Sequence, residues 1–412
     1  MEIWIPYGSS EVGVGVKPEN LSTIVKPKAQ QPVQDIRMEI ENAIANAIGN
    51  LKLEKKTDEE KNLAIIIDSY LENPFFDNIN SLILELCKRL EIHKLIISWK
   101  NKKGYEKLCQ ILQTSGISDI TLLDNDSSNS TFVSSKNSDE NKIQKNSPII
   151  DASLRVFIGR VGADPIWNYK GSASMSLALF DMESRDELFR TVLTSYLNGT
   201  TFNIKQLKEL INELVSSIGP CISFDFFVNE EGKTSKILAN FYDDSLIKSA
   251  NAIDEIYKVT TERPSDILVV SAGGSPYDNT LVNSLDAIML NKDLVKKGGT
   301  IILVAECIDG YGNEEFLEIT TKPSELNIKP LLKKEPKIGK IKAYVLKELL
   351  DDFRLCLVSV MPDHYAKNIF KFRTFRTVGD ALQSALRVIG KQATITVVPY
   401  GAFTYGTIKE TH

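Results

Sequence analysis

Apolar runs alternate with helical stripes along this chain of 412 residues. The clearest case is a β-branched run at Ile267–Ala272, a stripe of apolar residues at spacings of three and four within Leu281–Met289, and a second apolar run at Thr300–Ala305. Short continuous apolar runs predict buried strands, and the stripe predicts an amphipathic helix. The order strand, helix, strand predicts a βαβ unit with parallel pairing.

The same order occurs earlier, with a strand at Leu63–Ile67, a helix at about Ile79–Leu90 and a strand at Lys94–Ser98. Asp35 is placed to cap the start of another helix, and Gly49 to end it. Further elements are predicted by the same patterns: two short strands within Ile3–Val16; helices at Asp35–Ile48, Ser245–Val259, Ile341–Leu350 and Thr377–Ile389; and strands at Leu154–Gly159, Ile222–Val228, Ile237–Tyr242, Leu355–Val360 and Ala393–Val398.

These elements predict an α/β fold with two α/β domains, mainly parallel sheets and a cleft between the domains. The boundary falls at Glu262-Arg263-Pro264, which gives domains at 1–262 and 263–412. A stretch at about 124–147 is rich in Ser and Asn and poor in apolar residues, so we expect a flexible loop there.

Ligands of parallel sheets lie outside the carboxyl ends of the strands. In the Ile267–Ala305 unit this rule places two segments, Gly273–Asn279 and Glu306–Asn313, at the mouth of a site. A double glycine in such a place equally fits a plain structural turn that needs positive φ. The candidate ligand-binding residues of this unit are Gly273, Gly274, Ser275, Asp278, Asn279 and Glu306.

Asp68 is a further candidate, because it follows the strand Leu63–Ile67 directly. A carboxylate at the end of a strand is either a ligand group or the N-cap of the next helix, and the pattern alone does not decide between the two.

Composition and charge exclude several classes of protein. A formal net charge of −5 argues against a nucleic-acid binder. No apolar run approaches the length that spans a bilayer, and the opening MEIWIPYGSSEVGV lacks a signal pattern, so we expect no membrane partner. The five cysteines are far apart and odd in number, which is typical of buried thiols in a reducing compartment. A cytoplasmic location is expected.

Several segments resemble the nickel-pincer lactate racemase family. They read SAGGSPYDN, KKGGTIILVAECIDGYGNEEF, IPYGSSEVGVGV, GKIKAY and TITVVPYGAFTYG. The resemblance extends over most of the chain and implies two α/β domains around a cleft. It also implies chemistry on a 2-hydroxy acid: a proton is abstracted and returned, and hydride passes through a nickel-pincer nucleotide.

The groups that this chemistry needs are missing at the matching positions. Counting without gaps from Gly159, the resemblance places the family's catalytic histidine on Asp164, its cofactor-linked lysine on Ser174 and its nickel histidine on Arg190. Lys170 is the only lysine nearby and lies four residues before Ser174. The cofactor therefore stays unknown, and we expect neither a catalytic set nor a metal site of the family type.

Two other family motifs differ as well. Where the family has Asp-His-Thr-Arg-Pro, whose arginine is expected to hold the substrate carboxylate, this chain has Asp68 followed by Ser-Tyr-Leu-Glu-Asn-Pro. Where the family has a glutamine and a lysine on the helix after the double glycine, this chain has Asn283 and Asp286. We expect Asp286 to face solvent or to cap a neighbouring element.

Three hypotheses follow. The leading one is a divergent lactate racemase-like protein without nickel-dependent racemase activity, a pseudoenzyme that binds a small anionic ligand or nucleotide in the interdomain cleft or acts as a partner subunit or homo-oligomer. The alternative is a racemase or epimerase of a 2-hydroxy acid with a rebuilt site. The third, an ordinary nucleotide-binding α/β protein, rests on fold analogy alone. The rebuilt site would use residues from this set: Asp68, Asp164, Lys170, Asp278 and Glu306.

Overall fold

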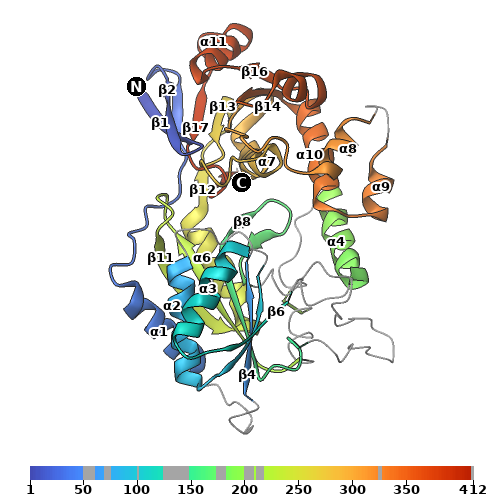
Figure 1. The fold of residues 1–412 in the computed structure, drawn as a ribbon. Coiled ribbons are helices and arrows are strands. Elements are labelled where there is room, and N and C mark those ends of the chain that lie inside the picture. Colours follow the sequence, from blue (N-terminus) through green and yellow to red (C-terminus); the bar gives the residue numbers. More distant parts are fainter. Residues whose placement is uncertain are drawn as a thin grey trace.

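The chain forms two lobes, each built on a six-stranded sheet, in a computed structural model (Figure 1). The structure describes residues 1–49, 61–68, 76–99, 102–123, 148–172, 182–198, 208–209, 218–322 and 327–409. The expected loop at about 124–147 lies outside the described residues. No helix in the described ranges is both long and apolar enough to cross a membrane.

The first lobe has the strand order β11-β10-β7-β4-β5-β6, and only the β10–β11 pair is antiparallel. Helix α1 packs on α2 and β11, and α6 packs on β10 and β11. The elements are β4 (Asn62–Ile67), β5 (Lys94–Ser98), β6 (Asp119–Leu123), β7 (Leu154–Arg160), β10 (Cys221–Val228), β11 (Thr234–Phe241), α1 (Ile36–Ile48), α2 (Phe76–Leu90), α3 (Lys102–Thr114), α4 (Met182–Leu197) and α6 (Tyr242–Tyr257).

The second lobe has the order β16-β15-β14-β13-β17-β3, and all its strands are parallel. Strand β13, at the middle of this sheet, buries five consecutive residues. The elements are β3 (Leu21–Ile24), β13 (Ser265–Ser271), β14 (Val295–Val304), β15 (Arg354–Val358), β16 (Arg373–Phe375), β17 (Ile395–Val398), α7 (Leu281–Asn291), the 3-10 turn η3 (Lys292–Leu294), α8 (Glu314–Thr320), α9 (Lys329–Lys334), α10 (Ile338–Asp352), the π-helical turn η4 (His364–Ile369) and α11 (Val378–Ile389).

Three two-stranded ladders complete the fold: β1 (Glu2–Tyr7) with β2 (Ser10–Gly15), β8 (Gly162–Asp164) with β9 (Asn168–Lys170), and β12 (Lys258–Thr261) with β18 (Tyr405–Ile408). The β8–β9 hairpin reaches from the first lobe toward the second, and α4 lies against α9 of the second lobe (Figure 1).

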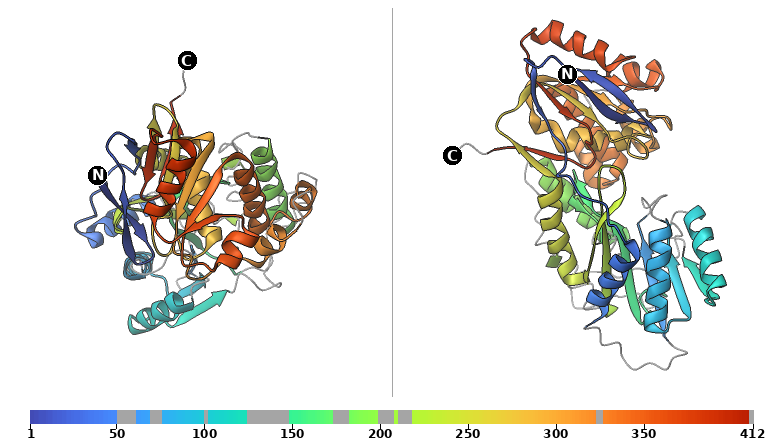
Figure 2. Two further views of the ribbon diagram at one scale, coloured as in Figure 1. Left: turned by 90° about the horizontal axis from the view of Figure 1, so that it is seen from above. Right: turned by 90° about the vertical axis from the view of Figure 1, so that its left-hand side faces the viewer.

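The amino-terminal segment packs with the second lobe, although the predicted division at residue 262 grouped it with the first. Strand β3 pairs with β17, and β2 contacts α11. Figure 2 shows the N end of the chain on the same lobe as the orange and red carboxy-terminal elements. The chain then crosses to the first lobe at Lys28, whose N–H donates to the carbonyl of Ile256 at 2.9 Å, where the chain crosses back. The hydrophobic pattern predicted β2 and β17 but not the short strand β3, and it carried no information about which strands pair.

The predicted helix signals are present in the structure. Asp35 caps α1, since its Oδ1 accepts hydrogen bonds from the N–H groups of Arg37 and Met38, both at 3.0 Å. Thr280 and Thr377 cap α7 and α11 in the same way. Each cap satisfies a backbone donor that a helix start would otherwise leave unpaired. The cysteines are free thiols, four of them buried and Cys109 half-buried.

Candidate functional site

Three charged residues end successive strands at the side of the first lobe that faces the second. They are Arg160 at the end of β7, Asp164 at the end of β8 and Lys170 at the end of β9. In the β8–β9 ladder Gly162 is opposite Lys170 and Asp164 is opposite Asn168. Because side chains alternate between faces, Asp164 and Lys170 lie on the same face of the hairpin, as diagonal neighbours.

Gly162 makes room for the lysine side chain. A Cβ atom on Gly162 would lie 3.2 Å from Cε of Lys170 and 3.8 Å from its Cγ. The aliphatic part of Lys170 therefore lies across the glycine backbone, which restricts the position of the ammonium group.

Hydrogen bonds fix the rest of the hairpin. Asp164 Oδ1 accepts from the N–H groups of residues 166 and 167, at 2.9 and 2.7 Å, and so closes the turn. The hydroxyl of Tyr169 donates to Asp254 on α6 at 3.2 Å. Beyond Lys170, the fully buried Asp225 accepts from the N–H of Ser172 at 2.8 Å and from the hydroxyl of Ser249 at 2.6 Å. The hairpin is tied to the first lobe on both sides.

Asp68 and Asp286 approach this hairpin from two other elements. Asp68 follows β4, and its N–H donates to the carbonyl of Ile158 on β7 at 3.0 Å. Asp286 lies on α7, which contacts β8, and its Oδ1 is 2.8 Å from Nζ of the buried Lys342 on α10. The expectation that Asp286 faces solvent or caps a neighbouring element is wrong, because this ion pair joins α7 to α10.

The neighbouring charges and burial shift the pKa values of the two hairpin residues in opposite directions. Burial lowers the pKa of Lys170 below its usual 10.5, and Arg160 lowers it further, while Asp286, Asp164 and Asp68 act in the other direction. Burial also raises the pKa of Asp164 above its usual 3.8, although Lys170 and the two backbone N–H donors oppose that shift. A neutral amine and a protonated carboxyl are thus both more accessible here than in water.

The ammonium of Lys170 forms no hydrogen bond or ion pair with any other residue in the described part of the chain. Its neighbouring carboxylates are engaged elsewhere, since Asp164 closes its own turn and Asp286 contacts Lys342. The half-buried lysine experiences the repulsive charge of Arg160, and its own charge has no direct partner among the described residues.

Arg160 links the lobes through two aromatic rings. Its guanidinium carbon lies 4.6 Å from the ring centroid of Tyr277 and 5.2 Å from that of Phe403. These rings belong to the second lobe and meet edge to face, with centroids 4.4 Å apart. Arg160 is only 5% exposed, so the interaction between cation and ring is shielded from water and correspondingly strong. The sequence patterns did not single out this arginine.

Four of the six predicted residues of the second lobe, Gly274, Ser275, Asp278 and Glu306, lie against a different feature, the amino-terminal turn at Gly8. Asp278 Oδ2 accepts from the N–H groups of Gly8 at 2.6 Å and of Glu306 at 3.1 Å, and the N–H of Ser275 donates to the carbonyl of Gly8 at 2.8 Å. A Cβ on Gly8 would collide with the carboxylate of Glu306. Asn279 accepts a hydrogen bond from the N–H of Asp309 through its backbone carbonyl. These contacts hold the β1–β2 hairpin on the second lobe.

The double glycine itself has the conformation of a structural turn. Gly273 and Gly274 have φ of +108° and +75°, a region that residues with a Cβ rarely adopt. A Cβ on Gly274 would lie 2.8 Å from the carbonyl oxygen of Gly8 and 3.2 Å from Cβ of Pro6. The glycines allow close approach of the amino-terminal turn, which favours the structural interpretation left open by the sequence.

We therefore expect Gly274→Ala to destabilise the protein more than Gly298→Ala. Gly298 has a similar φ of +79° but open space around it, so its alanine variant suffers only the backbone strain of about 1–2 kcal/mol. Gly274→Ala adds a clash that costs about 1–3 kcal/mol more. Urea unfolding of both variants measures the difference, and equal losses would show that the contact with Gly8 is unimportant.

A cavity of about 840 Å³ separates the lobes next to the hairpin. Asp164 and Tyr169 line it from the first lobe, and residues of α7, η3 and α10 line it from the second. Its acidic lining residues outnumber its basic ones, and Lys170 is not among them. Arg160 also lies outside this lining.

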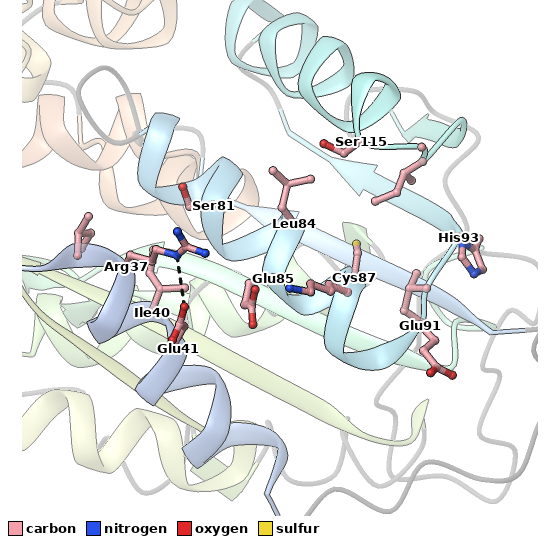
Figure 3. A pocket seen from close by; sticks show the side chains of 15 residues that line it. Arg37, Ile40, Glu41, Ser81, Leu84, Glu85, Cys87, Glu91, His93 and Ser115 are labelled. Carbon is pink, nitrogen blue, oxygen red and sulfur yellow. Dashed lines mark ion pairs between the residues drawn. The ribbon is translucent and has the colours of Figure 1, made fainter.

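A second pocket of about 840 Å³ lies on the outer face of the first lobe, between α1, α2 and the turn after α3 (Figure 3). Apolar side chains such as Ile40 and Leu84 line it together with Cys87 and His93. None of the predicted site residues lines this pocket, and it is remote from the interdomain hairpin.

The residues present do not fit a nickel-pincer nucleotide of the family type. Arg190, at the position matched to the nickel histidine, donates through Nε to the carbonyl of Lys333 at 3.0 Å, and a guanidinium cannot serve as a metal ligand. Ser174, matched to the cofactor lysine, lies outside the described residues, as does the segment 69–75 that follows Asp68. Elsewhere in the described ranges, no three His, Cys, Asp or Glu side chains form a group that could hold a metal.

Both domain models and both sequence relatives that match this chain are lactate racemases. The lactate racemase N-terminal domain matches residues 7–172, and the lactate racemase C-terminal domain matches residues 260–404. The lactate racemase of Thermoanaerobacterium thermosaccharolyticum is 23% identical over 97% of both chains, and that of Lactiplantibacillus plantarum is 28% identical over 33% of both.

Solved structures show the same fold. The lactate racemase apoprotein of T. thermosaccharolyticum superposes with a TM-score of 0.80 at 19% identity, over the whole of both chains. A protein from Thermotoga maritima has a TM-score of 0.61 at 11% identity, over 93% of this chain and all of its own. The matches to both domain models together span more than half of the sequence, and the chain therefore belongs to the lactate racemase family.

Proposed function

We propose that this member of the family does not racemise lactate through nickel and instead binds a small carboxylate at Lys170. The observation that carries this proposal is an ammonium without a direct ionic partner in the described chain, near enough to Arg160 for the two positive charges to repel each other. The charge of Arg160 disfavours the charged form of Lys170, and a carboxylate bound at Lys170 would offset that repulsion while it gains a charge-assisted hydrogen bond.

The neighbouring carboxylates support this assignment because their other contacts keep them from pairing directly with the ammonium of Lys170. Asp164 uses one oxygen for the turn, and Asp286 has Lys342. Arg190 occupies the position matched to the nickel histidine and cannot bind a metal. This supports the part of the proposal by which the protein does not racemise lactate through nickel.

An enzyme with a rebuilt site is the second candidate. Its support is the pair Lys170 and Asp164, whose pKa values shift toward each other, which is a common property of acid/base pairs. Asp278 and Glu306 give this candidate no support, because their contacts hold the Gly8 turn.

Two measurements on the purified protein test the proposal. Incubation with L-lactate and with D-lactate, with and without added nickel, should leave the enantiomers unchanged by chiral chromatography. Titration calorimetry with oxalate should show binding that Lys170→Met weakens at least tenfold, because a hydrogen bond to a charged group contributes about 1.5–3 kcal/mol.

Lys236→Met is the matched control for the calorimetry. Lys236 is an exposed lysine on β11 of the same lobe, and its loss should leave the affinity for oxalate unchanged. Racemisation of lactate by the protein isolated from its own source would overturn the negative part of the proposal. Equal oxalate affinities in wild type and Lys170→Met would overturn the assignment of the anion to Lys170.

A further inference from the structure

The hairpin places an amine and a carboxyl group side by side on one face, at the edge of an interdomain cavity. Lys170 and Asp164 are diagonal neighbours in the β8–β9 ladder, and Asp164 lines the cavity. An amine beside a proton donor, with a cation nearby to attract a carboxylate, is the arrangement that forms an imine with a small oxo acid. This juxtaposition indicates that Lys170 can react with a ligand as well as attract it electrostatically.

We propose that Lys170 forms a reversible covalent imine with a small 2-oxo acid and that Asp164 transfers the protons. The inference rests on the proposed function, because the carboxylate of the oxo acid would use the anion site beside Arg160. It goes further by naming the ligand as a carbonyl compound and Nζ of Lys170 as a nucleophile.

The step balances with no other reactant. The lone pair of the neutral amine attacks the carbonyl carbon, a C–N bond forms, and the carbonyl oxygen becomes a hydroxyl group after proton transfer from nitrogen. The Asp164 carboxyl then donates a proton to the hydroxyl, which leaves as water while the C=N bond forms. The carboxylate of Asp164 recovers the second proton from nitrogen, and hydrolysis reverses the sequence.

The surroundings provide the protonation states that this step needs. The charged groups that face Lys170 are Arg160 from β7, Asp286 from α7, Asp164 from β8 and Asp68 from the end of β4. Burial and Arg160 lower the pKa of Lys170, so a larger fraction of its amine is neutral than in water. Burial raises the pKa of Asp164, so its carboxyl keeps a proton more readily.

The hairpin is also held in place for such a reaction. Gly162 fixes the path of the lysine side chain, and Asp225 anchors the residues that follow it. The second oxygen of Asp164 remains for proton transfer, because only Oδ1 accepts the hydrogen bonds that close the turn. Positioned groups of this kind raise the effective concentration of the reacting atoms.

Borohydride trapping tests the inference. The full-length protein is incubated with pyruvate, reduced with sodium borohydride, digested and mapped by mass spectrometry. The reduced adduct is expected on Lys170 in preference to exposed lysines such as Lys236, and it should be absent from Lys170→Met. Asp164→Asn keeps an oxygen acceptor for the turn but loses the acid, so trapping should slow about a hundredfold.

The pH dependence adds a second readout that a structural role would not produce. The rate of trapping should rise with pH through the lowered pKa of Lys170, below 10.5, while the affinity for oxalate should fall through the same range. Adducts spread over exposed lysines, or no adduct at all, would overturn the imine. Oxalate has no ketone and cannot form an imine. If oxalate binding depends on Lys170 but no pyruvate adduct is trapped there, the proposed function stands and only the covalent step is wrong.

Discussion

Replacement of Lys342 by methionine is expected to lower the free energy of unfolding by about 3–5 kcal/mol. Lys342 is buried, and its Nζ lies 2.8 Å from Asp286 Oδ1 and donates to the carbonyl of Val282 at 2.8 Å. Asp286 Oδ1 receives no aligned hydrogen bond, so it depends on the charge of Lys342. Without the lysine, a largely buried carboxyl group loses its counterion.

Urea unfolding of three variants separates this effect from a general loss of packing. Lys342→Met alone should be the least stable, and the double variant Lys342→Met/Asp286→Leu should recover most of the loss, since an apolar pair often replaces a buried ion pair without cost. Lys296→Met removes an exposed lysine paired with Asp266 and should cost at most about 1 kcal/mol. A double variant no more stable than Lys342→Met would contradict the electrostatic explanation.

Replacement of Lys170 by methionine should stabilise the protein by about 1 kcal/mol or more at neutral pH, because it removes a partly buried charge without a direct ionic partner in the described chain. The same variant should lose oxalate binding. A variant that is more stable than wild type but no longer binds its ligand indicates that the replaced residue serves function at a cost in stability. Thermal or urea unfolding of the variant and of wild type measures the first effect.

The advantage of Lys170→Met should depend on pH in a defined direction. The pKa of Lys170 is lowered in the folded state, so the charged lysine opposes folding fully at pH values below that lowered pKa. Between the lowered pKa and 10.5 the unfolded chain binds more protons at this site, and the stability of wild type rises with pH relative to the variant. The difference should shrink toward zero above 10.5. A difference that stays constant with pH would show that the pKa of Lys170 is the same in the folded and unfolded states, and would contradict the prediction.

The sequence predicted most elements of the fold because both βαβ units combine long apolar runs with clear helical stripes. The strand Lys94–Ser98 has the same bounds in the structure, and the helix stripe within Leu281–Met289 lies in α7. The sequence could not predict that β3 pairs with β17, because strand pairing depends on contacts between residues far apart in the chain.

The candidate site was predicted in part. The structure places Asp164 and Lys170 on one interdomain hairpin with Asp68 near it, whereas Gly274, Ser275, Asp278 and Glu306 of the second lobe lie against Gly8. Arg160 was missed, although an arginine that ends a fully buried strand is an unusual residue in that place. Lys342 was missed because a lysine in an amphipathic helix is normally exposed, and only the fold shows that it faces Asp286.

The crossing of the chain at Lys28 and Ile256 affects the order in which the protein can form during synthesis. The first lobe lies between two segments of the second in sequence, so its sheet is complete once β11 has left the ribosome. The second sheet needs β17 and β3, which come from opposite ends of the chain, and must wait until almost the whole protein has been made. Until then β3 and the apolar residues of the β1–β2 hairpin lack their partners in the second lobe, so they are exposed to wrong pairing in the nascent chain.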